Sequence, residues 1–459
     1  MGSWKSPTIK SSHTVLICPA SPTAPDERHL ALTNLDRNET RIFTPAILLY
    51  AAPANLDLQT VVASLKESLR KTLVEYYPFA GRFTKGEDGL EEVLCNDAGA
   101  FFTEAVVEET LEEIGGFEGC VMLSGMEAAG LRSMGFHSLD EYEEIPPLVI
   151  QVTSFKCQSI ALAVNWYHMV CDGFAGMTFL KAWSELARGL PITSLPDHRR
   201  HLLAARVPPQ PLGEVPTGFE LLSAKPEEQE SVADSEVDEK KPCKKVEFIL
   251  SEKDIKQLKK QASGAFTSGE CISAHLWKLV TKARGLSRED TTTIFTVVDA
   301  RKRIKDFPLN YFGNCVFARR SDCTVGDVLD RPLGHLAQLI HDSVSGVTDE
   351  YVRSVVDYIE VTGASNLAWS RQRITTHNLQ PTFWRFFPIY ELDFGFGVPT
   401  YGGRNSPIEG STGFAGVIPT PTTSRDGSVL INVFLFQEAA DNLAATLGVQ
   451  CSFAAQAHG

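Results

Sequence analysis

Between residues 58 and 73, apolar side chains recur at intervals of three or four residues, and this spacing predicts an amphipathic helix. The stripe consists of Leu58, Val61, Val62, Leu65, Leu69 and Leu73. The helical pattern stops within residues 77–82 (YPFAGR), because proline and glycine interrupt helices. A short strand and a turn at residues 87–89 (EDG) are expected next, so this part of the chain should lead from a helix into a sheet.

Two runs of β-branched and apolar residues lie at residues 148–152 and 160–164, with the polar residues 156–159 between them. These runs predict two strands that form a hairpin. Apolar residues then return to helical spacing at positions 174, 177, 180, 183 and 186, and the pattern ends at Gly189 and Pro191. The segment 168–173 therefore lies at a junction between a strand and a helix.

The composition changes at residues 225–245, which are rich in charged residues and offer almost nothing to bury. We interpret residues 206–245 as a crossover linker between an N-terminal domain (residues 1–205) and a C-terminal domain (residues 246–459). The second domain should open with a strand at 246–250 and a helix that Ser251 caps, with Ile255 and Leu258 buried. Further expected elements are a helix at 272–283 and strands at 293–298, near 388–392 and at 429–436.

The composition narrows the possible partners and compartments. With 459 residues, 43% of them hydrophobic, the chain can bury the cores of two domains. A net charge of -14 argues against binding to nucleic acid, so an anionic ligand needs a local basic patch. No apolar run approaches the ~18 residues that span a bilayer. The ten cysteines form no Cys-x-x-Cys pair and no secretory signal is recognised, which favours reduced thiols in a cytoplasmic protein.

His168 stands at the end of the second predicted strand of the hairpin. It shares a parity with the large apolar side chains at positions 160, 162, 164 and 166, so it should point toward the apolar interior. Free imidazole titrates near pH ~6.5, and in its neutral form it can accept a proton. His168 is therefore a candidate base, and the alternative is a histidine that only fills a polar position in the core.

Asp172, followed by Gly173, stands where the next helix should begin, so an N-cap is its simplest structural role. A zinc site at His168 and Asp172 is excluded, because no third ligand has suitable spacing and no His-Glu-x-x-His motif occurs. The sequence also lacks a Gly-x-Ser-x-Gly motif, a Walker loop and a dinucleotide-binding glycine motif. A kinase-like triplet at Asp393 has no catalytic loop to accompany it. Hydrolase, nucleotidase, dehydrogenase and kinase functions therefore lose their main support.

Two motifs together resemble a known family. His168-x-x-x-Asp172-Gly173 in the first half and residues 393–397 (DFGFG) in the second half are similar, in order and spacing, to the paired signatures of plant BAHD acyltransferases. The similarity extends over nearly the whole chain, and it includes residues 77–82 (YPFAGR), 208–211 (PPQP), 311–314 (YFGN) and 351–354 (YVRS).

The resemblance implies an α/β fold of two similar domains, each a mixed sheet with flanking helices as in chloramphenicol acetyltransferase, with a channel between them. Acyl-CoA and a small-molecule acceptor would enter this channel from opposite faces, and His168 would lie midway as the general base. The acceptor would attack the thioester directly, without a covalent acyl-enzyme, a metal ion or any cofactor beyond the co-substrate acyl-CoA. A monomer is expected.

The resemblance also assigns roles to other residues. Asp172 would turn away from the reacting atoms and pair with Arg301, and Asp393 would shape a structural loop. The family usually has Trp where Phe396 stands, and phenylalanine has no N–H donor. Thr382 and Trp384 match a segment that contacts the acceptor and the oxyanion in hydroxycinnamoyl-transferring members, although packing at a strand start explains them equally well.

Candidate contacts to CoA are basic residues and one helix start. Arg301, Lys302 and Arg303, and the cluster at residues 240–245, could meet phosphates, but each could also be a solvated surface. Ser273, expected to open a helix near His275, is a further candidate. Arg371 and Arg373 come near the position of a carboxylate-binding arginine only if a gap is allowed.

The function expected from this resemblance is transfer of an aromatic, hydroxycinnamoyl-type acyl group from CoA to a hydroxyl acceptor such as shikimate or quinate. A transferase for an amine such as spermidine, or for a long-chain alcohol, is the first alternative. A non-catalytic member that acts by binding a partner is the second, and the Phe396 departure is its only support in the sequence.

Overall fold

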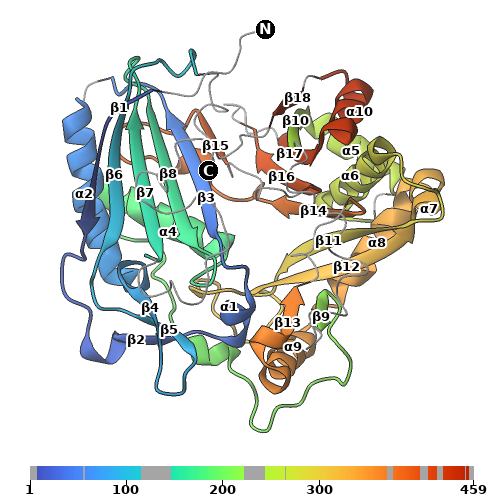
Figure 1. The fold of residues 1–459 in the computed structure, drawn as a ribbon, viewed down its shortest axis with the longest axis horizontal. Helices are drawn as coiled ribbons and strands as arrows, with labels where there is room; N and C mark the ends of the chain where they lie inside the picture. Colours follow the sequence, from blue (N-terminus) through green and yellow to red (C-terminus); the bar gives the residue numbers. More distant parts are fainter. Residues whose placement is uncertain are drawn as a thin grey trace, which may run out of the picture.

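The computed structural model describes residues 8–54, 57–114, 146–221, 243–263, 265–369, 376–403, 412–420, 427–449 and 451–453. Two mixed β-sheets organise these residues, and helices flank each sheet (Figure 1). The first sheet belongs almost entirely to the N-terminal half of the chain and the second to the C-terminal half. The expected α/β architecture of two domains, each with a mixed sheet, is confirmed.

The first sheet has six strands in the order β1-β6-β7-β8-β3-β15. Their bounds are Ile9–Ile17 (β1), Ala100–Val107 (β6), Leu148–Ser154 (β7), Ile160–Tyr167 (β8), Phe43–Tyr50 (β3) and Tyr401–Gly403 (β15). Only β6 and β7 run parallel, and the other neighbours are antiparallel. Helices α2 (Leu58–Glu75) and α4 (Gly173–Ala187) pack against each other, and the indole of Trp183 donates to the carbonyl of Leu65 at 3.2 Å.

The second sheet has seven strands in the order β12-β11-β14-β16-β17-β10-β18. Their bounds are Val316–Thr324 (β12), Thr291–Asp299 (β11), Asn378–Phe383 (β14), Phe414–Pro419 (β16), Val429–Phe436 (β17), Cys243–Leu250 (β10) and Cys451–Phe453 (β18). β14 runs parallel to β11 and to β16, and the other pairs are antiparallel. Its helices are α5 (Glu252–Gln261), α6 (Ser268–Arg284), α7 (Val325–Asp330), α8 (Leu333–Ser345) and α10 (Gln437–Leu447).

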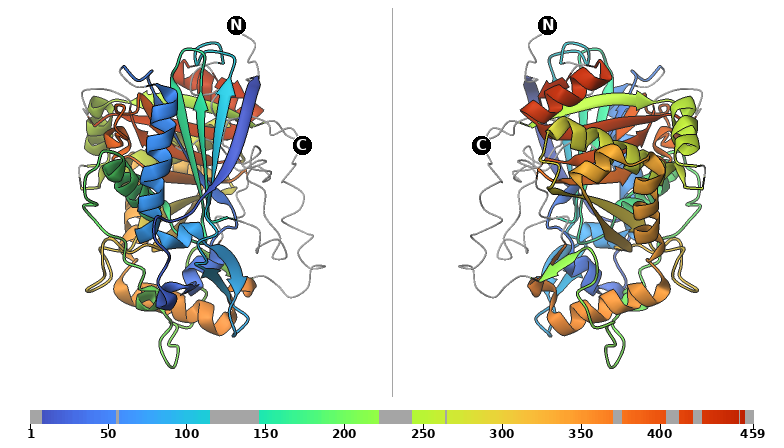
Figure 2. Two further views of the ribbon diagram at one scale, coloured as in Figure 1. Left: turned by 90° about the vertical axis from the view of Figure 1, so that its left-hand side faces the viewer. Right: turned by 90° about the vertical axis from the view of Figure 1, so that its right-hand side faces the viewer.

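Smaller elements gather at one end of the molecule. They are the sheet β2 (His29–Ala31), β5 (Glu91–Leu94) and β4 (Arg82–Lys85), the pair β9 (Phe219–Leu221) and β13 (Leu367–Trp369), and the helices α1 (Asn34–Asn38) and α9 (Asp349–Thr362). Helix α9 contacts α1 and lies at the end opposite α10 (Figures 1 and 2). Short 3₁₀ helices lie at Pro25–Glu27, Tyr77–Ala80, Arg200–Leu203, Ala364–Asn366 and Ile389–Glu391.

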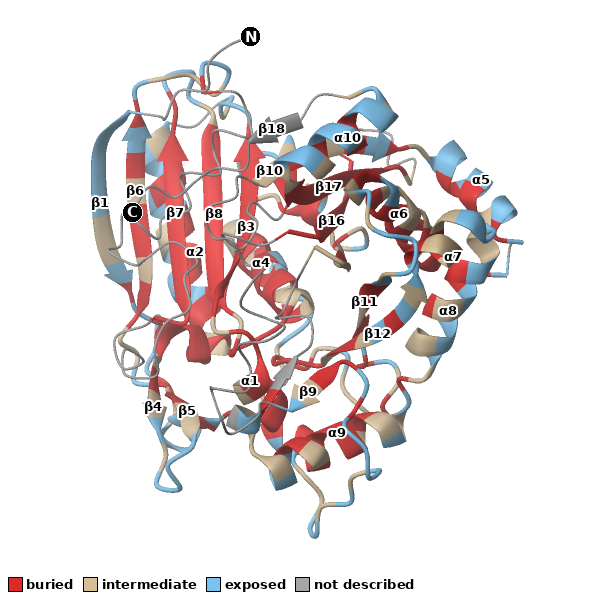
Figure 3. Ribbon diagram, turned by 45° about the vertical axis from the view of Figure 1, so that its right-hand side comes forward, coloured by how far each residue is buried: buried red, intermediate tan, exposed pale blue. Residues whose placement is uncertain are grey.

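Burial follows the position of each strand in its sheet. Every residue of β3, β7 and β8 is buried, whereas the edge strand β1 is exposed over most of its length (Figure 3). The core of the first half also takes in Phe312, Trp384 and Phe394 from the second half of the chain. Strand β15 crosses over as well, and Tyr401 pairs with Leu49 of β3. The two halves are therefore joined by shared apolar packing as well as by the chain.

Most predicted elements are confirmed. The amphipathic stripe forms α2, the two apolar runs form the antiparallel hairpin β7-β8, and the helix after residue 173 is α4. Ser251 caps α5 by accepting from the N–H of Asp254, and Ile255 and Leu258 are buried. In the helices the local pattern and the backbone geometry agree because one face is buried, and the apolar runs of β7 and β8 agree with burial of both faces.

Some boundaries differ from the predictions. The strand expected near residues 388–392 is the 3₁₀ helix Ile389–Glu391, which follows Pro388 and packs Ile389 into the core of the first half. The range 206–245 contains β9 and the first residues of β10, which begins at Cys243. Residues 222–242, which include part of the expected linker, lie outside the described residues.

Within the described ranges, none of the helices combines the length and apolar character that crossing a bilayer requires. Among the cysteines in this part of the chain, Cys95, Cys171, Cys271 and Cys315 are buried.

Candidate active site

His168 is the first residue after β8 and begins the turn that leads to α4. Its backbone N–H donates to the carbonyl of Ile42 at 2.9 Å, and its carbonyl accepts from Asn314 Nδ2 at 2.8 Å. The side chain is 15% exposed. Strand β8 ends at Tyr167, one residue before His168. The backbone that carries the imidazole is therefore fixed by these two hydrogen bonds and not by the regular geometry of the strand.

Asp172 and Arg301 form a buried ion pair behind this turn. Two hydrogen bonds join the guanidinium to the carboxylate, from Nη1 to Oδ2 at 2.8 Å and from Nη2 to Oδ1 at 3.0 Å, and both side chains are 1% exposed. Asp172 Oδ1 also accepts from the N–H of Ala175, and Oδ2 accepts from the N–H of Cys315. The predicted N-cap and the predicted pairing with Arg301 are both confirmed.

The charge of Arg301 is well compensated. Burial acts to lower the pKa of this guanidinium, but the carboxylates of Asp172 and Asp299 outweigh it and leave the pKa above its usual value. Arg301 also donates to the carbonyls of Tyr311 and Gly313. The pair thus ties the start of α4 to the segment after β11, and so it joins the two halves directly behind His168.

A second buried network reaches the same turn from the other side. Asp36 accepts from the N–H and the Nδ2 of Asn314, at 3.0 and 2.9 Å, and it pairs with Arg200 at 2.5 Å. Arg200 also donates to the carbonyl of Val170 at 2.8 Å. Asn314 holds the carbonyl of His168. Asp36 therefore acts on the histidine through Asn314, and Arg200 does so by holding Asp36. Sequence analysis missed Asp36 and Arg200, because they pair with each other across 164 residues of chain and Asn314 lies 278 residues from Asp36.

Glu39 is a further residue that sequence analysis missed. Its side chain is 1% exposed, and Oε2 lies 3.5 Å from Nδ1 of His168. No local pattern distinguishes this carboxylate from the charged residues around it at positions 36–41, so the sequence held no signal that could have found it.

The loop that contains Asp393 lies against the first sheet. Asp393 Oδ1 accepts from the N–H groups of Gly395 and Gly397, which adopt φ angles of 95° and 111°. The rings of Phe394 and Phe396 pack on Tyr50, with centroid distances of 6.3 and 4.9 Å. This loop leads into β15. The glycines are needed here because other residues rarely adopt positive φ.

We expect replacement of Asp393 by alanine to lower the free energy of unfolding by about 1 kcal/mol, because two backbone donors lose their acceptor. Urea unfolding measures this loss. Asp88→Ala is a suitable control, since the carboxylate of Asp88 accepts from one exposed N–H, that of Leu90. An unchanged unfolding midpoint for Asp393→Ala would contradict the structural role of this residue.

Thr382 and Trp384 lie at the end of β14, and Thr382 pairs with Gly416 of β16. The indole of Trp384 is buried and stacks on Trp166 of β8, with ring centroids 6.5 Å apart and an interplanar angle of 18°. A Cβ built on Gly173 would lie 3.8 Å from Nε1 of Trp384. The structure therefore brings this segment to the start of α4, close to the turn that holds His168.

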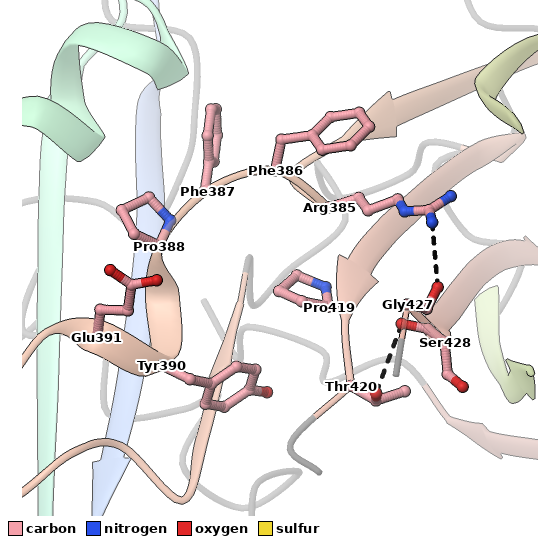
Figure 4. Close-up of a pocket in the computed structure, with 10 residues that line it drawn as sticks. All are labelled: Arg385, Phe386, Phe387, Pro388, Tyr390, Glu391, Pro419, Thr420, Gly427 and Ser428. Atoms are coloured by element: carbon pink, nitrogen blue, oxygen red, sulfur yellow. Dashed lines mark hydrogen bonds between the residues drawn. The ribbon is translucent and has the colours of Figure 1, made fainter. Parts of the chain in front are cut away.

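A pocket of about 240 Å³ opens directly after Trp384 (Figure 4). One wall is the segment that contains Phe386, Phe387 and Tyr390, and the opposite wall is formed by the strand ends at Pro419 and Gly427. Phe386 is 81% exposed. The guanidinium of Arg385 reaches across to donate to the carbonyl of Gly427 at 3.1 Å. The lining thus combines three aromatic residues with two prolines, the charged residues Arg385 and Glu391, and the small or polar residues Thr420, Gly427 and Ser428.

The residues considered for CoA do not form one cluster. Arg301 is buried against Asp172, and Arg303 donates to the carbonyls of Val344 and Val347 at the end of α8. Lys302 is exposed on the turn between them. The expectation that Ser273 opens a helix is wrong, because α6 begins at Ser268 and Ser273 is fully buried within it.

Two lysines of the other basic cluster, residues 240–245, form ion pairs within the chain. Lys244 pairs with Asp441 at 2.8 Å and Lys245 with Glu247 at 3.4 Å, so both ammonium groups face carboxylates. The rest of the cluster, and the arginines Arg371 and Arg373, lie outside the described residues. Across the described ranges, no group of three His, Cys, Asp or Glu side chains is arranged to hold a metal ion.

His168 lies at the turn between β8 and α4, with the buried Asp172–Arg301 pair behind it, in a fold of two mixed sheets. A family model described as the Transferase family matches residues 8–444. The chain belongs to this family, the acyl-CoA-dependent BAHD acyltransferases.

Relatives and a solved structure agree with this membership. The chain is 31% identical to shikimate O-hydroxycinnamoyltransferase of Nicotiana tabacum, over 93% of this chain and 96% of the relative. It is 32% identical to hydroxycinnamoyl-CoA:5-hydroxyanthranilate N-hydroxycinnamoyltransferase HHT1 of Avena sativa, over 94% and 97%. The crystal structure of vinorine synthase has the same fold, with a TM-score of 0.71, 24% identity, and coverage of 97% of this chain and 99% of that chain.

Proposed function

We propose that this acyltransferase moves a hydroxycinnamoyl-type group from CoA to a hydroxyl of a small acceptor such as shikimate or quinate, with His168 as the general base. The observation that carries the proposal is the placement of His168, whose backbone is held on both sides by hydrogen bonds while its side chain stays 15% exposed. The donor class is supported by two relatives whose names both specify hydroxycinnamoyl transfer.

In the proposed reaction, the neutral imidazole of His168 takes the proton of the acceptor hydroxyl as the oxygen attacks the thioester carbonyl. A C–O bond forms, and the carbonyl electrons move onto oxygen to give a tetrahedral oxyanion. When the carbonyl reforms, the C–S bond breaks and the CoA thiolate takes the proton from the imidazolium. The products are the ester and free CoA, and no covalent acyl-enzyme is needed.

The roles of the other residues follow from their positions. Thr382 carries an O–H donor near the end of β14 and Trp384 carries an N–H donor close to the start of α4, and we assign both to the oxyanion and the acceptor. Of the cluster Arg301, Lys302 and Arg303, we still assign Lys302 to CoA, because it is exposed whereas Arg301 is buried. Asp172 and Asp393 hold the backbone around the site and stay away from the reacting atoms. The enzyme is expected to work as a cytoplasmic monomer without a metal ion, so EDTA should leave turnover unchanged.

The pocket after Trp384 supports an aromatic substrate. Its walls carry the rings of Phe386, Phe387 and Tyr390, which can stack on a planar aromatic group (Figure 4). We propose that the aromatic part of the acyl group or of the acceptor occupies this pocket.

A panel of donors and acceptors tests the proposed function by the rate of CoA thiol release. We expect release with hydroxycinnamoyl-CoA and shikimate or quinate to exceed release with acetyl-CoA by about tenfold or more, because burying an aromatic group against the rings that line the pocket stabilises the bound state by ~1.4 kcal/mol or more. Reactions without acceptor are the control.

The alternatives give different outcomes in the same panel. Turnover of spermidine, of an aromatic amine or of a long-chain alcohol, without turnover of shikimate or quinate, would replace the proposed acceptor class. The name of the oat relative makes the amine the first of these to test. Absence of CoA release with every pair would instead favour a non-catalytic member that binds a partner.

A further inference from the structure

Glu39 is a carboxylate buried beside the proposed base. It follows α1 as the C-cap residue, and its N–H donates to the carbonyl of Asp36. Its side chain is 1% exposed, and Oε2 accepts from the N–H of Thr40 at 3.2 Å. A carboxylate is placed in a protein interior at a large desolvation cost, so a nearby group that can carry positive charge stabilises it.

The group it faces is the imidazole of His168. Oε2 of Glu39 lies 3.5 Å from Nδ1 of His168. The two nitrogens of an imidazole point to different sides of the ring, so a carboxylate at Nδ1 leaves Nε2 directed elsewhere. If Nδ1 carries the proton and donates a hydrogen bond to Glu39, Nε2 holds the lone pair and is the basic atom. The separation of 3.5 Å is within ion-pair range when the ring is charged, and a small approach of the two side chains would bring the atoms to hydrogen-bond distance.

Within the described ranges, the cationic side chains that contact the segment from His168 to Asp172 are each paired with carboxylates. Arg41 pairs with Glu91, Arg200 with Asp36, and Arg301 with both Asp172 and Asp299. Burial raises the pKa of the Tyr167 phenol and of the Cys171 thiol well above their usual values, so neither group changes charge between about pH 5 and 9. Glu39 is therefore the carboxylate whose removal should change the titration of the imidazole most.

We propose that Glu39 is a positioning residue for the general base. It accepts a hydrogen bond from Nδ1–H of His168, selects Nε2 as the atom that takes the acceptor proton, and stabilises the imidazolium that forms in that step. This inference rests on the proposed function, in which His168 is the base. Glu39 touches neither the substrate nor the reacting atoms, and it acts only through His168.

The test compares Glu39→Gln with the wild-type enzyme across pH. The carboxylate favours the protonated imidazole, so in the wild type kcat/KM falls on the acid side as His168 becomes charged. Without that carboxylate the imidazolium is less stable, and the acid limb of the profile should move to lower pH by about one unit or more. At pH 8, kcat should fall about 10–100-fold with little change in KM, because substrate contacts are untouched.

Two further variants separate positioning from folding. Glu39→Asp keeps the charge and should return the acid limb to near its wild-type pH, while kcat recovers only in part. Glu185→Gln alters a carboxylate that is 5% exposed and accepts from Thr193, so it matches the burial but not the location. It should leave both the pH profile and kcat unchanged, even if its thermal midpoint falls.

The outcomes distinguish this inference from the proposed function. If His168→Ala is inactive but Glu39→Gln keeps the wild-type acid limb and kcat, the positioning role of Glu39 is wrong and the base assignment stands. If His168→Ala retains turnover, the base assignment fails first. A Glu39→Gln enzyme that loses activity and thermal stability together, with Glu39→Asp equally inactive and unfolded, would reduce Glu39 to a structural residue.

Discussion

Replacing His168 with alanine should lower the rate of CoA release by about 10²–10⁴-fold, the range that a general base contributes. The variant should fold, because both hydrogen bonds that His168 makes with Ile42 and Asn314 use its backbone and survive the substitution. The side chain itself is partly exposed, so its removal leaves no large buried cavity. Thiol detection measures the rate, and far-ultraviolet circular dichroism measures the fold.

A second histidine variant controls for nonspecific effects. His29 is 65% exposed and pairs with Glu92 on the small sheet, away from the turn after β8. His29→Ala should retain full activity. If His168→Ala kept more than about a tenth of the wild-type rate, the assignment of the base would be lost, because removal of a general base costs at least ~10²-fold.

The second large effect is expected at Asp172, and it is an effect on stability. Asp172→Asn leaves the buried guanidinium of Arg301 with only the partly exposed carboxylate of Asp299, 3.1 Å away, and breaking a buried pair in this way costs about 3–5 kcal/mol. Arg301 also holds the carbonyls of Tyr311 and Gly313, so the segment that presents Asn314 to His168 should loosen as well. Activity and the urea unfolding midpoint should therefore fall together.

An exposed ion pair provides the comparison. Arg320 and Asp322 are bonded at 2.8 Å, but their side chains are 39% and 42% exposed. Asp322→Asn should cost at most ~1 kcal/mol, since surface pairs are screened by solvent. Loss of activity in Asp172→Asn without loss of stability would point to a direct chemical role for Asp172 and against the structural role described above.

Much of the fold follows from local patterns in the sequence. The stripe of α2, the apolar runs of β7 and β8, and the caps at Asp172 and Ser251 all appear in the structure where the pattern places them. Each of these features depends on residues that are close together in the sequence, so a local pattern is enough to predict it.

The errors in the prediction occur where distant parts of the chain decide the backbone. Residues 388–392 have the composition of a strand, but they form a 3₁₀ turn that packs against the first sheet. The chain then continues into β15, which adds to the edge of that sheet beside β3. Ser273 resembles a helix start only if Thr267 is overlooked, and the cap that Thr267 and Glu270 form begins α6 five residues earlier.

The sequence by itself determined the two-domain α/β class, the family, and the pair of residues, His168 and Asp172, around which the site is built. Only the tertiary structure decided what surrounds them. Glu39, which faces His168, precedes it by more than a hundred residues in the sequence. Asn314, which holds the carbonyl of His168, follows it by more than a hundred. Hydrophobic periodicity reports which face of an element is buried, but a hydrogen bond between single polar atoms depends on how the elements finally pack, and no local pattern records that.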